Sequence, residues 1–336
     1  MILPWHQPEF QRLLQEGAGL PHALLIRGPE GIGKLEFARS LAEALLCEEA
    51  QAGRAACGHC SSCEWIAQGT HPDFRVVEPD SIQAQEDEEP GDRKKGSTQI
   101  NVDQVRALTD FVSLSSHRGQ SKVILVHPAE AMNTSAANAL LKSLEEPPPA
   151  TYFLLVAHRW HQLPATIKSR CRQVVLAPPD RESARDWLAE QGTAQAELAL
   201  AHAGGAPLSA ARHESEYWEQ RAAFLAAITT SEFDPLRAAE QLRDLALPDL
   251  VKWLQQWSYD MAFHRASGRV RYHPDFEEQV GRAAGRTSML DTLRFHRQMV
   301  RWQRVVNHPL NPRLFLEELL LSYGALVSAR RPRQMQ

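Results

Sequence analysis

Long hydrophobic runs are missing from this sequence of 336 residues, so no segment suits a membrane span. The first ten residues, MILPWHQPEF, also lack the positively charged start and long apolar core of a secretory leader. Lys and Arg (37) do not outnumber Asp and Glu (41), and the net charge of −4 argues against a broadly basic nucleic-acid binder. We therefore expect a soluble, cytoplasmic protein with two or three domains.

Cysteine is scarce, with five residues in the chain, but four of them share one short window. Their spacing is Cys47-x9-Cys57-x2-Cys60-x2-Cys63, and in a reducing compartment such clustering favours a metal over disulfides. Four thiolates suit tetrahedral Zn²⁺ in a closed structural site. Two alternatives stay open: His59 could replace one thiolate, and Cys47 could be only a buried cysteine at a helix end. No adjacent general base points to catalytic zinc.

A hydroxyl is missing at the end of a glycine-rich loop. A buried strand is predicted over residues 24–26, followed by GPEGIGK (residues 28–34) and a helical pattern. Strand, loop and helix in this order form a phosphate cradle of backbone N–H groups and a lysine. Its residues here are Gly28, Gly31, Gly33 and Lys34. The next position normally carries Ser or Thr to ligate Mg²⁺, but here it is Leu35. The loop indicates an ATPase-like protein that does not hydrolyse ATP, and ATP binding without turnover stays open.

Two carboxylates are also missing from the strand that should carry them. In P-loop ATPases a later strand ends in acidic residues that hold Mg²⁺ and polarise the attacking water. The corresponding stretch, KVILVHPAEAM (residues 122–132), has His127 and Pro128 at those positions. Proline can neither accept a proton nor orient water, and Glu130 follows beyond a proline bend. Together with Leu35, these losses are hard to reconcile with hydrolysis.

Alternating strands and helices are predicted up to about residue 176. Apolar runs predict strands at 24–26, 74–78, 122–126, 152–156 and 173–176, and helical spacing predicts helices at 5–16, 34–46, 101–115 and 133–146. This order indicates a parallel sheet with helices on both faces. Beyond Pro178 and Pro179 the pattern is helical, with an interruption at 204–207. A helix over residues 247–262 carries a stripe typical of a bundle core, namely Leu250, Leu254, Trp257 and Met261.

The sequence from residue 118 to 179 resembles the AAA+ core of bacterial clamp-loader subunits. Its most specific parts are NALLKSLEEPP (residues 138–148), the triplet Ser169-Arg170-Cys171, and the cysteine cluster followed by GTHPDF (residues 69–74). The resemblance covers the whole chain, strongly to residue 179 and by layout beyond it. It implies an α/β AAA+ P-loop domain over 1–178 with a zinc module at 47–63, a small helical lid domain over 179–213, and an all-α collar domain for oligomerisation over 214–336.

Clamp loaders of this family have five subunits in a ring, and each ATP lies at a junction between neighbours. The resemblance implies a non-hydrolysing subunit that completes the ring with the gamma/tau ATPase and delta subunits and helps to load the sliding clamp onto primed DNA. Arg170 would act in trans as an arginine finger that neutralises charge on a neighbour's transferred phosphoryl group. Without the family match, Arg170 would be interpreted as a surface salt-bridge residue. Contacts with primer–template DNA would be to phosphate and independent of sequence.

Two further positions depart from the active members of the family. The lid motif Gly-Ser-x-Arg reads GGAP at residues 204–207, with Pro207 at the arginine position, and the usual Thr-Thr before the finger reads Ala157-His158. The alternative function is an active AAA+ ATPase with an unorthodox metal site, favoured only by the retained phosphate loop. A zinc-bearing DNA-binding module is a third interpretation, which the acidic balance disfavours. Residues 83–97 (QAQEDEEPGDRKKGS) are interpreted as a charged surface loop rather than a regulatory element.

Overall fold

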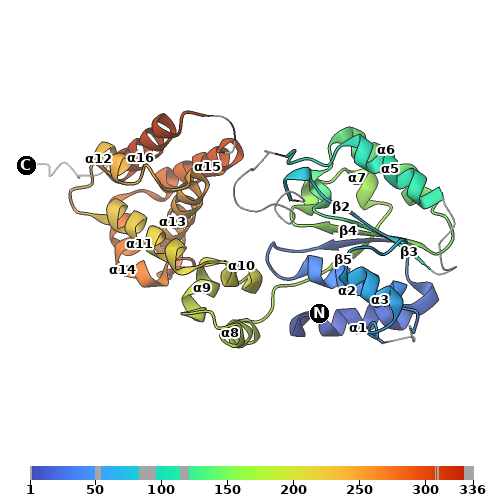
Figure 1. The fold of residues 1–336 in the computed structure, drawn as a ribbon. Coiled ribbons are helices and arrows are strands. Elements are labelled where there is room, and N and C mark those ends of the chain that lie inside the picture. Colours follow the sequence, from blue (N-terminus) through green and yellow to red (C-terminus); the bar gives the residue numbers. More distant parts are fainter. Residues whose placement is uncertain are drawn as a thin grey trace, which may run out of the picture. The chain divides into compact units, whose positions relative to one another are not determined.

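The computed structural model describes residues 2–49, 54–82, 96–113, 121–306, 308 and 310–328. The chain divides into two compact units, Met1–Ser183 and Ala184–Gln336 (Figure 1). In the described part, all strands belong to the first unit, and the second unit is helical. Among the described helices, none is both long and apolar enough to pass through a membrane.

The first unit is built on a five-stranded parallel sheet. Its strands are β1 (Ala23–Arg27), β2 (Phe74–Val77), β3 (Lys122–Val126), β4 (Thr151–Ala157) and β5 (Arg172–Val175). Their order across the sheet is β2-β3-β4-β1-β5, so β1 pairs with two strands that come much later in the chain. The five predicted strands are confirmed to within one residue at each end. Because all are parallel, their carboxyl ends share one edge of the sheet, where open α/β sheets bind ligands.

Helices cover both faces of this sheet (Figure 1). On one face lie α1 (Gln7–Glu16), α2 (Lys34–Leu46) and α3 (Ser61–Ala67), and on the other lie α5 (Val102–Ser113), α6 (Thr134–Glu145) and α7 (Ala165–Lys168). Short 3₁₀ helices join these elements: η1 (Pro4–His6), η2 (Gly17–Gly19), η3 (Ala129–Ala131) and η4 (Trp160–Gln162). The central strands β1, β3 and β4 are buried except for Arg27 and Tyr152, which are partly buried, and this explains their apolar runs. The predicted fold class is confirmed.

Asparagine side chains begin two of these helices. At the start of α6, Asn133 Oδ1 accepts a hydrogen bond from the N–H of Ala136 at 2.8 Å. At the start of α5, Asn101 Oδ1 accepts hydrogen bonds from the N–H groups of residues 103 and 104. The expected end of α5 at 114–115, and the charged stretch from residue 83 to 95, lie outside the described residues.

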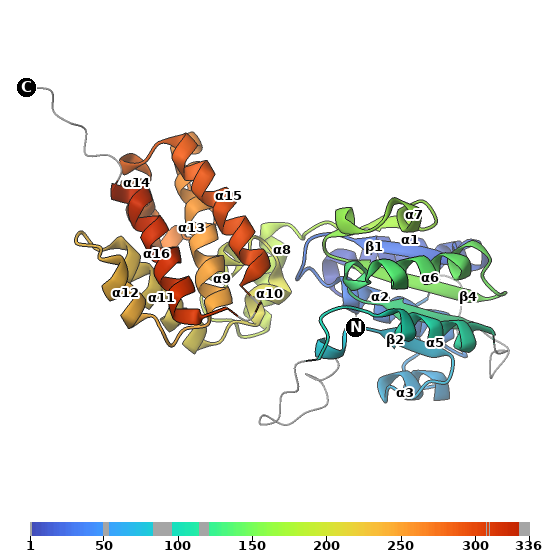
Figure 2. The same cartoon turned by 90° about the horizontal axis from the view of Figure 1, so that it is seen from above.

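The second unit is an array of helices with two apolar cores. Its elements are α8 (Arg181–Glu190, beginning just before the unit), α9 (Ala196–His202), α10 (Pro207–Ala211), α11 (Ser215–Thr229), α12 (Pro235–Gln241), α13 (Leu247–Ser267), η5 (Pro274–Phe276), α14 (Glu277–Arg286), α15 (Met289–Val305) and α16 (Pro312–Ser328). A small core surrounds Leu188 and Leu200, and a larger one surrounds Trp253 and Trp257 of α13. Figure 2 shows α13 between α15 and α16. The predicted stripe on α13 is buried and is confirmed as core, whereas separate lid and collar domains stay a prediction.

Candidate functional site

The glycine-rich loop connects β1 to α2 at the carboxyl edge of the sheet. Gly31 and Gly33 have φ angles of 75° and 96°, in the left-handed region that favours glycine. A Cβ atom at Gly28 would collide with the carbonyl of Leu176, so this position also requires glycine. The loop therefore has the backbone of a phosphate cradle at the N-terminus of α2.

Lys34 is buried and folded back onto its own loop. Its Nζ donates a hydrogen bond to the carbonyl oxygen of Pro29. Burial lowers the pKa of Lys34 to about 8, although the nearby carboxylates of Glu30 and Glu130 oppose this shift. The ammonium group that would contact phosphate is thus bound by a carbonyl of the cradle itself.

The N-terminal segment packs against the same loop, a contact that sequence reasoning missed. Trp5 Nε1 donates to the carbonyl oxygen of Ile32 at 2.9 Å, and His6 Nε2 lies 2.8 Å from the same oxygen. A Cβ atom at Gly33 would collide with the side chain of Leu3. These contacts join residues about 30 positions apart, and neither end carries a sequence signal for them. They cover one side of the loop and fix its conformation.

His127 belongs to a hydrogen-bonded group at the carboxyl ends of β2, β3 and β4. Its Nδ1 lies 3.0 Å from Glu78 Oε1, and its Nε2 lies 3.1 Å from His158 Nε2. The carboxylate of Glu130 is buried and accepts hydrogen bonds from the backbone N–H groups of His158 and Arg159, at 3.0 and 2.7 Å. Glu130 therefore binds backbone amides at the end of β4. Glu78, which the sequence analysis did not single out, is held by the histidine that replaces the expected acid.

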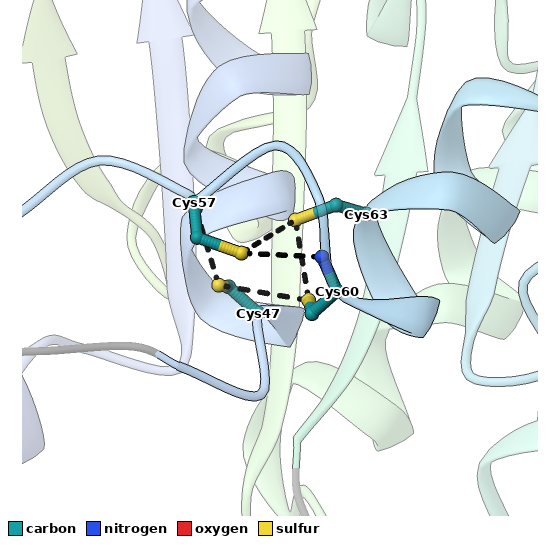
Figure 3. Close-up of side chains that lie close together, drawn as sticks. All are labelled: Cys47, Cys57, Cys60 and Cys63. Atoms are coloured by element: carbon teal, nitrogen blue, oxygen red, sulfur yellow. Dashed lines mark hydrogen bonds between the residues drawn. The ribbon is translucent and has the colours of Figure 1, made fainter.

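The four clustered cysteines converge with their sulfur atoms facing one another (Figure 3). Cys47 follows the last turn of α2, whereas Cys60 precedes α3 and Cys63 lies in its first turn. Sγ–Sγ distances are 3.9 Å for Cys47–Cys60, 3.9 Å for Cys57–Cys63 and 3.5 Å for Cys60–Cys63. Four sulfurs bound tetrahedrally to Zn²⁺ would be about 3.8 Å apart, given Zn–S bonds of about 2.3 Å. The four cysteines could therefore bind a metal ion and fit Zn²⁺.

The alternative ligand His59 lies beside this cluster. Its Nε2 is 3.7 Å from Glu49 Oε2, and both side chains are exposed. His59, Glu49 and Cys57 form a second group with metal-binding geometry, but two of its three members are exposed, whereas three of the four clustered cysteines are buried. The four-cysteine set is favoured as the metal site because most of its members are buried and because four thiolates suit tetrahedral Zn²⁺.

Arg170 lies between α7 and β5, at the amino edge of the sheet. Its Nε donates to Glu145 Oε1 at 2.5 Å, and its Nη1 donates to the Thr166 carbonyl at 3.0 Å. The phosphate loop follows β1, which is parallel to β5 and paired with it, so the loop lies at the opposite edge. Strands of four to five residues separate these two edges by roughly 15 Å. Arg172, in contrast, forms an ion pair with Glu16 within the same unit.

The predicted lid motif lies at the start of α10, in the second unit. Gly204 and Gly205 have φ angles of 67° and 92°, and Pro207 is the first residue of the helix and is buried. Pro207 carries no donor or charge for a phosphate. The motif therefore retains a tight turn without the arginine of the active relatives.

Beside this motif, three histidines are packed with aromatic rings. His202 Nε2 lies 2.8 Å from the hydroxyl oxygen of Tyr217, on which His213 stacks with ring centroids 3.8 Å apart. His273 Nδ1 lies 2.9 Å from Asp260 Oδ2, and both side chains are fully buried. Burial lowers the pKa of all three imidazoles, to about 4 for His213, because the charged form loses its hydration.

We expect acid to destabilise the second unit through these histidines. Unfolding restores pKa values near 6.5, so the unfolded chain binds protons below that pH that the folded unit rejects. Stability is thus complete above about pH 6.5 and falls as the pH drops towards the lowered values. Each imidazole that stays neutral in the folded unit adds up to about 1.4 kcal/mol per pH unit to the decline below pH 6.5. Denaturant unfolding at several pH values measures this slope, and His213→Phe should lower it by about 1 kcal/mol per pH unit between pH 6 and 5; an unchanged slope would contradict this account.

A family model and two relatives that span nearly the whole chain are all named for subunits of DNA polymerase III. The family model described as "DNA polymerase III, delta subunit" matches residues 6–180. The chain is 37% identical to the DNA polymerase III subunit delta' of Pseudomonas aeruginosa, covering 97% of this chain and 98% of that protein. It is 35% identical to the subunit of the same name from Escherichia coli K12, over 68% of this chain and 66% of that protein. Identity to the Yersinia pestis subunit is 32%, over 97% and 96% of the two chains. The chain therefore belongs to the delta-prime subunit family of DNA polymerase III.

Proposed function

We propose that this chain is a non-hydrolysing subunit of a DNA polymerase III clamp loader, which completes the five-membered ring and supplies Arg170 to a neighbour's ATP. The observation that carries the proposal is the position of Arg170 at the sheet edge opposite its own phosphate loop. A guanidinium there is too far from this chain's own nucleotide site to act on it. This distance supports a target on another subunit, as the finger role in trans requires.

The absence of hydrolysis is supported by the chemistry around the phosphate loop. Leu35 supplies no hydroxyl for Mg²⁺, and His127 is hydrogen-bonded to Glu78 where an acid should hold the metal. Lys34 donates a hydrogen bond to the carbonyl oxygen of Pro29, and Trp5, in the N-terminal segment of the chain, donates one to the carbonyl oxygen of Ile32 in the loop. The loop is stabilised by contacts of its own chain, which compete with phosphate. ATP binding without hydrolysis is compatible with the retained glycines.

The partners follow from the same proposal. The ring would contain the gamma/tau ATPase subunits and the delta subunit, and the sliding clamp and primer–template DNA would be engaged through the whole complex. Within this chain we assign the AAA+ nucleotide-binding-like domain, with the zinc module, to residues 1–178. We assign the lid domain to 179–213 and the collar domain to 214–336. The two separate apolar cores of the helical unit support the last division.

A second candidate is an active ATPase subunit of a clamp loader. The observation in its favour is the phosphate loop, in which Gly28, Gly33 and Lys34 keep the required backbone and cation. It would need an unorthodox metal site, and Glu130 is the nearest acid in the sequence. Because the Glu130 carboxylate already accepts hydrogen bonds from backbone amides, this candidate is the weaker one.

The isolated chain should not hydrolyse ATP above background, because it lacks the side-chain hydroxyl that ligates Mg²⁺ and the acids that orient the attacking water. Steady-state phosphate release by the purified chain is the measurement, with Lys34→Ala as the matched control for a contaminating ATPase. Mixing the chain with the ATPase subunits should instead raise DNA-stimulated turnover by the assembled complex. A rate typical of AAA+ enzymes from the chain alone, abolished by Lys34→Ala, would establish the second candidate.

A further inference from the structure

Acceptors of its own chain hold Arg170 on two sides. Nε donates to Glu145 Oε1 at 2.5 Å, and Nη2 forms an ion pair with the same oxygen. Nη1 donates to the Thr166 carbonyl at 3.0 Å and to the Ser169 hydroxyl at 3.3 Å. A guanidinium has five N–H groups. One of them, the second on Nη2, has no acceptor among the described residues.

The acceptors come from elements that are themselves fixed. Glu145 is the last residue of α6, which begins at the Asn133 cap and is packed into the sheet core through Leu140 and Leu144. Thr166 lies in α7, and α7 contacts α6. The side chain of Arg170 is therefore held by the ends of two helices that pack against each other.

This ion pair has little value for stability. The Arg170 side chain is 33% exposed and that of Glu145 is 48% exposed. Exposed pairs of this kind stabilise a fold by about 0–1 kcal/mol, because water screens the charges. The geometry has a clearer consequence: it fixes the plane of the guanidinium and leaves one N–H of Nη2 without an acceptor among the described residues.

We propose that Glu145 is a positioning residue for Arg170. Its carboxylate holds the Nε–Nη2 side of the guanidinium, so that the remaining N–H is presented to one phosphate oxygen of the neighbouring subunit's ATP. This inference rests on the proposed role of Arg170 as a finger in trans. Without Glu145, the arginine side chain would sample several rotamers. Reaching the transition state would then carry the additional entropic cost of fixing one of them.

The test uses complexes reconstituted from this full-length chain and the ATPase subunits. Glu145→Ala should lower DNA-stimulated kcat about tenfold, as expected for a misplaced catalytic group. Glu145→Gln should lower it less, because an amide oxygen can still accept from Nε but has no charge. Glu146→Ala is the matched control: it is the next residue, is exposed, and has no described side-chain hydrogen bond. Gel filtration checks assembly of every variant.

A double-mutant cycle separates positioning from a structural role. If Glu145 acts only through Arg170, adding Glu145→Ala to Arg170→Ala should cause no further loss of rate. A further loss in that background, or an equal loss from Glu146→Ala, would overturn the inference. The inference would also be overturned if Arg170→Ala slowed the complex but Glu145→Ala left the rate at the wild-type value. That result would leave the proposed function intact. A wild-type rate from Arg170→Ala itself would overturn both.

Discussion

Replacing Cys60 and Cys63 together by serine is expected to abolish Zn²⁺ binding and to unfold the region around the four sulfur atoms. Metal binding at structural sites contributes on the order of 10 kcal/mol to local folding. Here the metal would join the end of α2 to the start of α3, because Cys47 follows one helix and Cys60 precedes the other. Among the described residues, the apolar cluster in this region consists of the four cysteines and one alanine.

Elemental analysis should find one Zn²⁺ per wild-type chain and none in the double variant. Limited proteolysis should then cut the double variant between α2 and α3 at protease concentrations that leave the wild type intact. Cys171→Ser is the matched control, because Cys171 is also buried and unpaired but lies in the sheet core. Zinc at full stoichiometry in the double variant, or its absence from carefully prepared wild-type protein, would contradict the assignment.

Arg170→Ala is expected to slow ATP hydrolysis at one junction of the assembled ring by roughly 10³ to 10⁵, the range known for arginine fingers. The reason is that charge developing on the transferred phosphoryl group would lose its guanidinium partner. Only the complex should respond, because the target is a neighbour's ATP. The fold should survive, since the lost ion pair with Glu145 is exposed. The measurements are DNA-stimulated ATPase and clamp-loading rates of reconstituted complexes.

Two variants show whether charge alone suffices. Arg170→Lys should rescue poorly, because an ammonium keeps the charge but lacks the planar fork. Arg172→Ala should leave the ATPase rate close to wild type, since Arg172 pairs with Glu16 inside its own unit. Wild-type rates from an assembled Arg170→Ala complex would show that this subunit is only a scaffold.

The strands, the main helices and the cysteine cluster could be predicted because their signals are local. An apolar run such as residues 122–126 indicates a strand buried on both faces, and Asn133 and residues 147–149 bound one helix. The cysteine spacing places three thiols within seven residues, so the chain has few ways to keep them apart. The missing groups could also be predicted, because the side chains of Leu35 and Pro128 carry no atom that can ligate a metal in any fold.

The surroundings of each site were decided only by the tertiary structure. Glu78 lies 49 residues before His127, and Trp5 lies 27 residues before Ile32, so neither contact has a sequence period to reveal it. The partners Glu78 and His127 meet because β2 pairs with β3, and that pairing brings the ends of two distant strands together.

The same holds for the arginine. The sequence alone indicated Arg170 through its Ser-Arg-Cys context, but it did not indicate that Glu145, 25 residues earlier, would hold it. Because β1 and β5 run parallel in one sheet, the phosphate loop that follows β1 and Arg170, which precedes β5, lie at opposite edges. Local patterns specify which residues form strands and helices. Strand order, in contrast, depends on the summed burial of apolar faces across the whole chain, and the strand order determines which side chains meet.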